Sequence, residues 1–120
     1  MLYFVNWLEK KTITDRGGTL KEYSKYIRDY KCFEPSYFIG INYDGTVSPC
    51  CNIRNDIDKL KPYIIGDLNI NSLSEILNND KYKNFKLNCS NGNFEKNSPC
   101  YTCMNTGGRY TRGGAGIKYE

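Results

Sequence analysis

The sequence predicts a small α+β domain, in which a β-hairpin, a short additional strand and two or three helices surround a four-cysteine metal site. Strand-forming residues flank a tight-turn dipeptide between residues 37 and 48, and helix-start signals occur near residues 19 and 72. The third observation is the count of six cysteines in 120 residues. A chain of this size buries only about two thirds of its unfolded surface, so we expect an internal cross-link, such as a bound metal, to stabilise it.

The N-terminal half is expected to contain a helix and then the hairpin. Thr19 is followed three residues later by Glu22, a capping-box pattern that predicts a helix from about 19 to 30. Aromatic and β-branched side chains dominate residues 37–48, as is typical of strands. Asp44-Gly45 lies in the middle of this run and readily adopts the positive φ of a tight turn. The hairpin is therefore expected to turn at this dipeptide.

The C-terminal half is expected to contain a strand, a helical region and a loop. Residues 63–68 follow a polar stretch and predict a short third strand. Ser72-Leu73-Ser74-Glu75 is a second capping-box pattern, and it predicts helical structure over residues 72–87. Residues 78–80 are polar and should interrupt this region. The polar run 89–99 predicts a loop.

The cysteine positions predict a single metal site. Antiparallel strands joined by a short turn bring their outer ends together, so Cys32 and Cys50 should lie close to each other. Cys100 and Cys103 form a C-x2-C knuckle, a spacing that lets two sulfurs face one ion or cluster. These four cysteines are the candidate ligands.

The absence of histidine narrows the chemistry of this site. It removes the commonest general base and the mixed Cys/His zinc patterns. Thiolate-only sites favour either an iron-sulfur cluster or structural zinc, and the residues alone leave both open. With zinc, the domain would be a structural module whose surface binds another protein. A catalytic thiol enzyme is disfavoured, because no histidine can activate a cysteine.

Charge and hydropathy bear on partners and compartment. The net charge of +4 comes from scattered basic residues, a pattern that does not favour nucleic-acid binding. No run approaches the roughly 20 apolar residues of a membrane span, and the N-terminal sequence lacks the features of a signal peptide. We therefore expect a cytoplasmic protein, in a reducing compartment where clustered cysteines more often bind metal than form disulfides.

The order of these motifs resembles a known family. Over roughly residues 30–105, the pattern is similar to the C-terminal auxiliary-cluster region of radical S-adenosylmethionine enzymes, called SPASM, or twitch in its one-cluster form. The resemblance rests on Cys32-x12-Gly45-x4-Cys50, Ile65-Gly66-Asp67, Ser72-Leu73-x-Glu75-Ile76 and Pro99-Cys100-x2-Cys103. It implies that Cys32, Cys50, Cys100 and Cys103 ligate one [4Fe-4S] cluster. The two-cluster form has further cysteines after the knuckle, and this sequence has none after Cys103.

The resemblance also implies a larger assembly. The family's radical-generating core carries a C-x3-C-x2-C motif, which this sequence lacks, so the chain is not expected to be catalytic alone. The radical chemistry would belong to a core domain or a partner chain, with a peptide or protein as the substrate. The implied role is to shape the substrate pocket and relay electrons. Residues 1–31 would then be the end of a barrel and a linker with a helix, 32–105 the cluster domain, and 106–120 a Gly-rich flexible tail.

Two cysteines and four aromatic residues have secondary roles in this scheme. Cys51 and Cys89 are alternative ligands of lower rank, and Cys51 is expected to be a small buried residue. An apolar shell limits water access to a cluster. The candidates for this shell are Phe33, Tyr37, Tyr43 and Tyr101.

Overall fold

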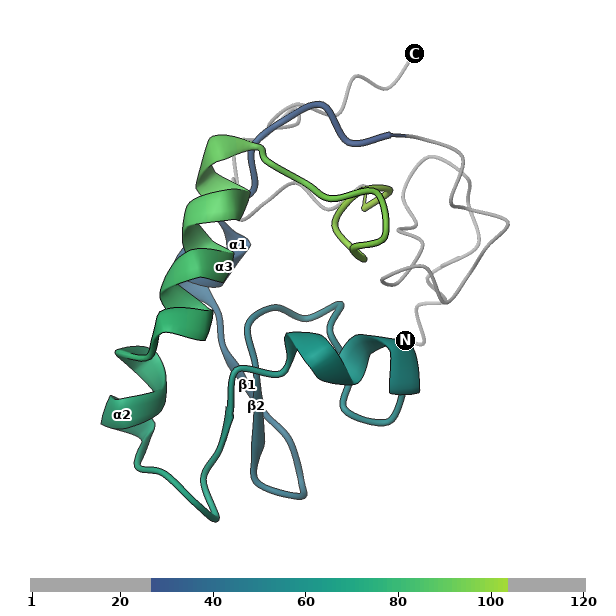
Figure 1. Ribbon diagram of the computed structural model, residues 1–120. Helices are drawn as coiled ribbons and strands as arrows, with labels where there is room; N and C mark the ends of the chain where they lie inside the picture. Colours follow the sequence, from purple (N-terminus) through teal and green to yellow (C-terminus); the bar gives the residue numbers. More distant parts are fainter. Residues whose placement is uncertain (1–26, 104–120) are drawn as a thin grey trace, which may run out of the picture.

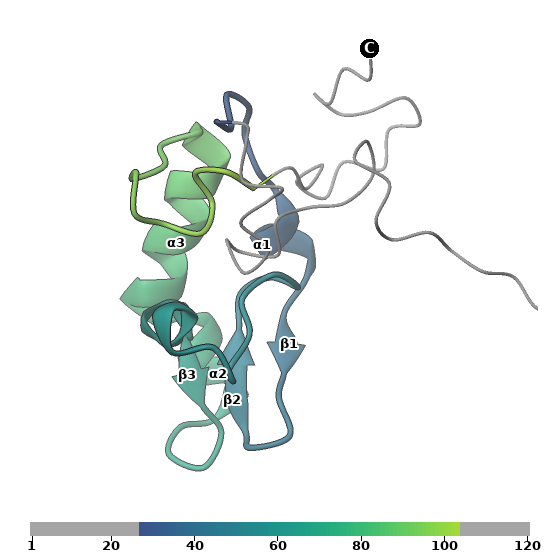
Figure 2. The same cartoon turned by 90° about the vertical axis from the view of Figure 1, so that its right-hand side faces the viewer.

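A three-stranded antiparallel sheet and the helices beside it form the described part of the chain. The computed structural model describes residues 27–103 (Figure 1). The elements, in order, are α1 (Glu34–Tyr37), β1 (Gly40–Ile41), β2 (Thr46–Ser48), the 3-10 helix η2 (Asp58–Tyr63), β3 (Gly66–Asp67), α2 (Leu73–Leu77) and α3 (Asp80–Asn91). The sheet order is β1-β2-β3, as Figure 2 shows. The predicted α+β class, with a hairpin, an additional strand and a few helices, is confirmed.

The hairpin turns where the sequence predicts. β1 pairs with β2 so that Ile41 lies opposite Val47. Gly45 has a φ of +89°, which suits a residue without a β-carbon. The Asp44 carboxylate accepts hydrogen bonds from the Thr46 backbone N–H at 3.0 Å and from its hydroxyl at 2.7 Å. Local hydrogen bonding therefore fixes the turn.

The first arm of the hairpin differs from the prediction. Residues 34–37 form the short helix α1 instead of continuing the strand. Pro35 lies in the first turn of this helix, where its missing N–H costs nothing and its fixed φ favours helix. This local signal outweighs the strand preference of the aromatic residues that follow.

The third strand is present and packs closely against α2. Gly66 of β3 lies opposite Val47 of β2, so the strand predicted within residues 63–68 is confirmed. A β-carbon at Gly66 would lie 2.6 Å from Ile76 Cγ1. The polar stretch before β3 contains the 3-10 helix η2, which buries Leu60. Because of the short distance between Gly66 and Ile76, only glycine fits at this position of β3.

Side-chain caps begin both of the longer helices. The Ser72 hydroxyl accepts a hydrogen bond from the Glu75 backbone N–H at 3.2 Å, as the capping-box pattern predicts. Asn79 interrupts the helical region where expected, and its side chain caps α3 by accepting a hydrogen bond from the Tyr82 N–H at 2.8 Å. α3 continues to Asn91 and ends at Gly92, which has a φ of +72°. The predicted helix end at residue 87 is therefore wrong, because the left-handed Gly92 sets the end of the helix.

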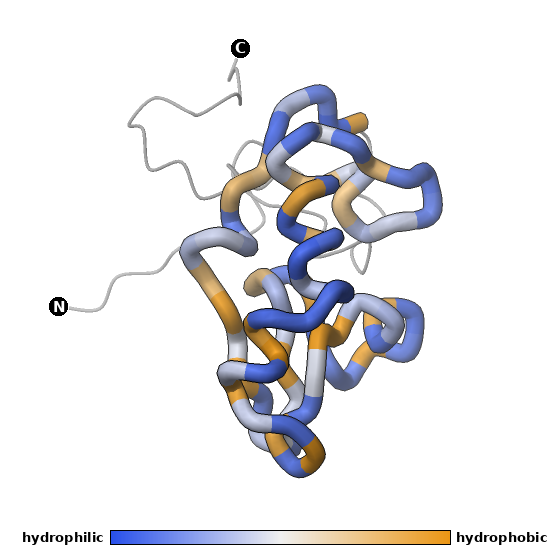
Figure 3. The backbone as a smooth tube through the Cα atoms, turned by 60° about the vertical axis from the view of Figure 1, so that its left-hand side comes forward, coloured by the Kyte–Doolittle hydropathy of each residue, from blue (hydrophilic) through white to orange (hydrophobic). Residues whose placement is uncertain are grey.

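The hydrophobic core lies between the sheet and the last two helices. Its buried residues are Val47, Ile65, Ile76 and Tyr82. Hydrophobic stretches alternate with hydrophilic ones through the sheet region, as Figure 3 shows. The Tyr82 hydroxyl donates a hydrogen bond to the Pro35 carbonyl, which ties α3 to α1.

The predicted helix over residues 19–30 falls mostly outside the described residues. Residues 27–30, which are described, are not helical. The predicted tail at 106–120 also lies outside the described residues. Within residues 27–103, every helix is too short or too polar to cross a lipid bilayer.

Candidate metal centre

Five of the six cysteines line one small cavity beside α3. They are Cys32, Cys50, Cys89, Cys100 and Cys103, and they share the cavity wall with Arg28, Glu34, Pro35, Asn52 and Phe85. All four predicted ligands therefore lie around the same cavity, and their role as ligands stays a prediction. Within residues 27–103, which contain all the cysteines, none is joined in a disulfide.

Backbone hydrogen bonds bring distant cysteines to this cavity. The Cys32 N–H donates to the Cys89 carbonyl at 2.8 Å, which joins the segment before α1 to the end of α3. The knuckle turns through a hydrogen bond of 3.2 Å from the Cys103 N–H to the Cys100 carbonyl. In Figure 1, the first described residues and the knuckle lie on the same side of the molecule. With Cys50, which follows β2, four separate stretches of chain thus contribute thiols to the cavity.

Hydrogen bonds link the thiols within the cavity. The Cys89 thiol hydrogen-bonds to Cys100 and Cys32, and this raises the pKa of Cys89. The hydrogen bond from Cys89 is also the main reason that the pKa of Cys32 falls to about 6. Burial raises the pKa of the Cys50 thiol well above its usual value. The Asn52 amide donates to Cys103 Sγ at 3.5 Å, so a neutral donor faces one of the sulfurs.

Cys89 is more central than the sequence indicated. It was expected in a loop as a lower-ranked ligand, but it lies in α3 with only 2% of its surface exposed. The spacing of Tyr82, Phe85 and Cys89, three and then four residues, places them on one helix face. That spacing was the available signal, and the polar residues between them masked it.

Other expectations about the surroundings are wrong. Cys51, predicted to be buried, is exposed and lies outside the thiol cavity. Tyr37 and Tyr43, predicted as part of an apolar shell, are 75% and 94% exposed. Phe85 lines the cavity instead. Tyr37 lies in α1 and Tyr43 in the hairpin turn, and both side chains extend into solvent.

The donor chemistry of the cavity fits a thiolate-held cluster. A cluster ligated by four thiolates is an anion, and hydrogen-bond donors, nearby positive charge and limited water stabilise it. Asn52 supplies a donor, Arg28 supplies a positive charge, and the cavity measures about 20 Å³. Within the described part of the chain, no three Cys, Asp or Glu side chains are arranged around a single-ion position.

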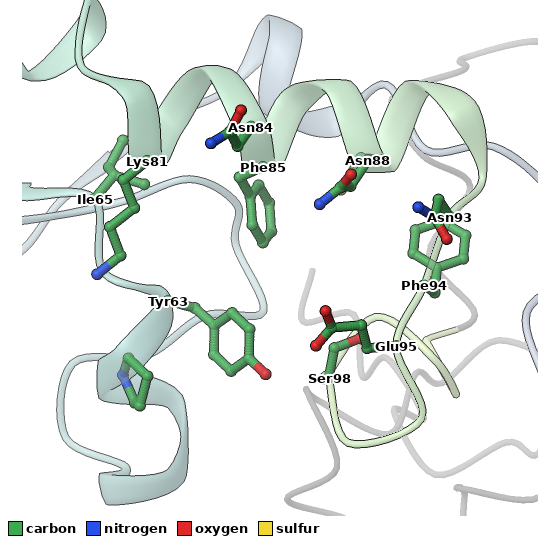
Figure 4. A pocket seen from close by; sticks show the side chains of 12 residues that line it. Tyr63, Ile65, Lys81, Asn84, Phe85, Asn88, Asn93, Phe94, Glu95 and Ser98 are labelled. Carbon is green, nitrogen blue, oxygen red and sulfur yellow. The ribbon is translucent and has the colours of Figure 1, made fainter.

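A second, larger groove adjoins the thiol cavity. It has a volume of about 280 Å³ and lies between α3, the end of η2 and the loop before the knuckle (Figure 4). Phe85 and Cys89 line both this groove and the thiol cavity. The remaining walls carry asparagine amides, aromatic rings and single charges, from Pro62, Tyr63, Ile65, Lys81, Asn84, Asn88, Asn93, Phe94, Glu95 and Ser98. The buried Ser98 hydroxyl oxygen has no hydrogen-bond partner among the described residues.

Comparison with known proteins gives one match. A family model for SPASM, described as an iron-sulfur cluster-binding domain, matches residues 32–104, more than half of the chain. No curated protein and no solved structure matches the chain. The matched residues include all six cysteines and the whole of the described sheet.

Proposed function

Because the chain belongs to the SPASM family of iron-sulfur cluster-binding domains, we propose that it binds one [4Fe-4S] cluster through Cys32, Cys50, Cys100 and Cys103. The observation that carries this proposal is the convergence of these four thiols, from three stretches of chain, on one cavity. The spacing of the hairpin and knuckle cysteines supports it independently.

The residues around the cavity have complementary tasks in this proposal. The four thiolates hold the iron, and the bound cluster supplies one-electron transfer. The Asn52 amide donates to Cys103 and reduces the negative charge on that sulfur. Phe85 and Pro35 form apolar wall and limit the access of water. Cys89 lies within the sulfur set but on the regular helix α3, and we assign it no iron.

The domain serves, in this proposal, as the auxiliary module of a radical S-adenosylmethionine enzyme. A core domain or a partner chain supplies the radical chemistry, since this sequence has no C-x3-C-x2-C motif. The module shapes the substrate pocket and relays electrons. The groove beside the thiol cavity supports this role, because a ligand there would touch Phe85 and Cys89, which also line the cavity.

A peptide or protein segment is the substrate class that we propose for this groove. Asn84, Asn88 and Asn93 offer both donors and acceptors, which complement the amides of a peptide main chain. The aromatic rings of Tyr63, Phe85 and Phe94 offer apolar area for a side chain (Figure 4). The groove volume of about 280 Å³ lies at the lower end of the range for ligand pockets, so the groove suits a short part of a peptide.

Anaerobic reconstitution with iron and sulfide tests the cluster assignment. We expect a brown protein with about four irons per chain, and loss of iron in each Cys→Ser variant of the four ligands. Cys51→Ser is the matched control, because Cys51 adjoins a ligand in sequence but lies outside the cavity. Cys89→Ser should also retain iron. A colourless protein that binds one zinc, or iron loss in Cys89→Ser with retention in one of the four, would contradict the assignment.

A further inference from the structure

Arg28 is a buried cation next to the candidate cluster site. It precedes the residues matched by the family model, and only 6% of its surface is exposed. Burying a charge is costly unless hydrogen bonds or an opposite charge compensate for it. Its burial beside thiols therefore calls for a structural or electrostatic reason.

The contacts of Arg28 join the two ends of the predicted ligand set. Its Nε donates to the Tyr30 carbonyl at 2.8 Å and its Nη2 to the Lys31 carbonyl at 2.9 Å, both just before Cys32. Its Nη1 donates to the Cys103 carbonyl at 3.1 Å, and its backbone N–H donates to the Tyr101 carbonyl at 2.7 Å. One side chain thus ties the segment leading to the first ligand to the residue of the last.

The surroundings keep the Arg28 charge partly shielded from water. The guanidinium carbon lies 4.1 Å from the centroid of the Tyr30 ring and 5.4 Å from that of Phe94. Aromatic faces attract a cation at such distances and exclude solvent. Arg28 also shares the cavity wall with Glu34. A weakly screened charge acts more strongly on its neighbours.

We propose that Arg28 is a positioning residue that clamps the Cys32 and Cys103 ends of the site together and favours reduction of the cluster bound there. The inference rests on the proposed function. In the reduction, the cluster gains one electron from a one-electron donor such as dithionite, and no protein bond forms or breaks. A nearby positive charge stabilises the more negative, reduced form more than the oxidised form, so it raises the reduction potential.

Spectroelectrochemical titration of the reconstituted full chain tests the charge. For Arg28→Met we expect the equilibrium constant for reduction to fall about tenfold, a shift of about 59 mV to more negative potential. Arg28→Lys keeps the charge and should stay near the wild-type potential. Arg54→Met is the matched control, because Arg54 is an exposed arginine paired with Asp56. An unchanged potential in Arg28→Met would overturn the electrostatic role.

Thermal unfolding tests the clamp separately. Lysine cannot reproduce the planar fork that reaches three carbonyls, so Arg28→Lys should unfold at a lower temperature than wild type, whereas Arg54→Met should not. Equal unfolding temperatures for Arg28→Lys and wild type would overturn the clamp. If Arg28→Met fails to load iron, Arg28→Gln, which removes the charge but keeps hydrogen-bond donors, should show the same fall in potential, and an unchanged potential there would overturn the electrostatic role. A wild-type chain that binds no iron defeats the proposed function instead, and the unfolding comparison still tests the clamp.

Discussion

Replacement of Gly66 by alanine tests how closely the sheet packs against α2. A β-carbon at residue 66 would lie 2.6, 2.8 and 2.9 Å from Ile76 Cγ1, Cγ2 and Cδ1. Two of these atoms are attached directly to the Ile76 β-carbon, so a side-chain rotation cannot remove both contacts. Ile76 itself is 1% exposed and has no free space to enter. The strand or the helix must therefore shift.

The expected cost follows from this geometry. Overpacking of a well-packed core typically costs about 1–3 kcal/mol. We expect Gly66→Ala to lower the free energy of unfolding by about 2 kcal/mol, which lowers the urea midpoint by about 1 M. Gly40→Ala is the matched control in the same sheet, since its added β-carbon would meet its neighbours at 3.5 Å or more. That variant should lie within about 0.5 kcal/mol of wild type, or be slightly more stable.

Urea unfolding followed by far-ultraviolet circular dichroism, on anaerobic samples of equal iron content, measures the effect. The double variant with Ile76→Ala identifies its cause, because that change removes all three atoms that the new β-carbon would meet. In this background Gly66→Ala should be nearly neutral. If Gly66→Ala costs the same with and without the Ile76 side chain, the steric argument is refuted.

Three further predictions concern a cap and two titrating groups. Asn79→Ala should lower the free energy of unfolding by about 1–2 kcal/mol in the same assay, because it removes the cap of α3 and a hydrogen bond to Ile65. Hydrogen bonds from Thr46 hold the pKa of the Asp44 carboxyl below its usual value of 3.8. The turn is therefore stabilised above that pH and loses this stabilisation on acidification. In Thr46→Ala, titration of the Asp44 carboxyl by NMR should give a higher pKa than in wild type. Burial raises the pKa of the Tyr30 hydroxyl to about 12. The stability that the neutral Tyr30 side chain contributes is therefore present below about pH 10 and is lost as the pH rises through 12. An alkaline titration followed by tyrosinate absorbance should show an ionisation step near pH 12 in wild type that is absent in Tyr30→Phe.

Local signals in the sequence predicted the elements whose causes are local. The Asp44-Gly45 turn forms because one carboxylate and one positive φ decide it within a few residues. The Ser72 cap forms for the same reason. α1 was missed because two local signals compete there, and the helix preference of Pro35 in the first turn exceeds the strand preference of Tyr37. The length of α3 was underestimated because Gly92 determines its end, beyond the apolar pattern.

The site shows the same division between local and distant causes. The four predicted ligands come from the segment before α1, the residues just after β2 and the knuckle; their spacings are readable along the chain, and the structure brings them to one cavity. Arg28 carries no such signal. It is one arginine in a polar segment, and its importance arises only where that segment packs on the knuckle. A buried charge whose partners lie far along the chain cannot be recognised from spacing alone.

Cys89 and Phe85 extend this argument to function. Both lie on the face of α3 that separates the thiol cavity from the larger groove, so one helix face borders both. A ligand in the groove would therefore sit against the cluster site without entering it. Enlarging the groove wall with Asn88→Trp, at a residue that lines the groove but not the thiol cavity, should fill part of the groove and weaken peptide binding, whereas the four ligands and their iron content stay unchanged. If peptide binding by that variant equals that of wild type at equal iron content, the proposed role of the groove fails.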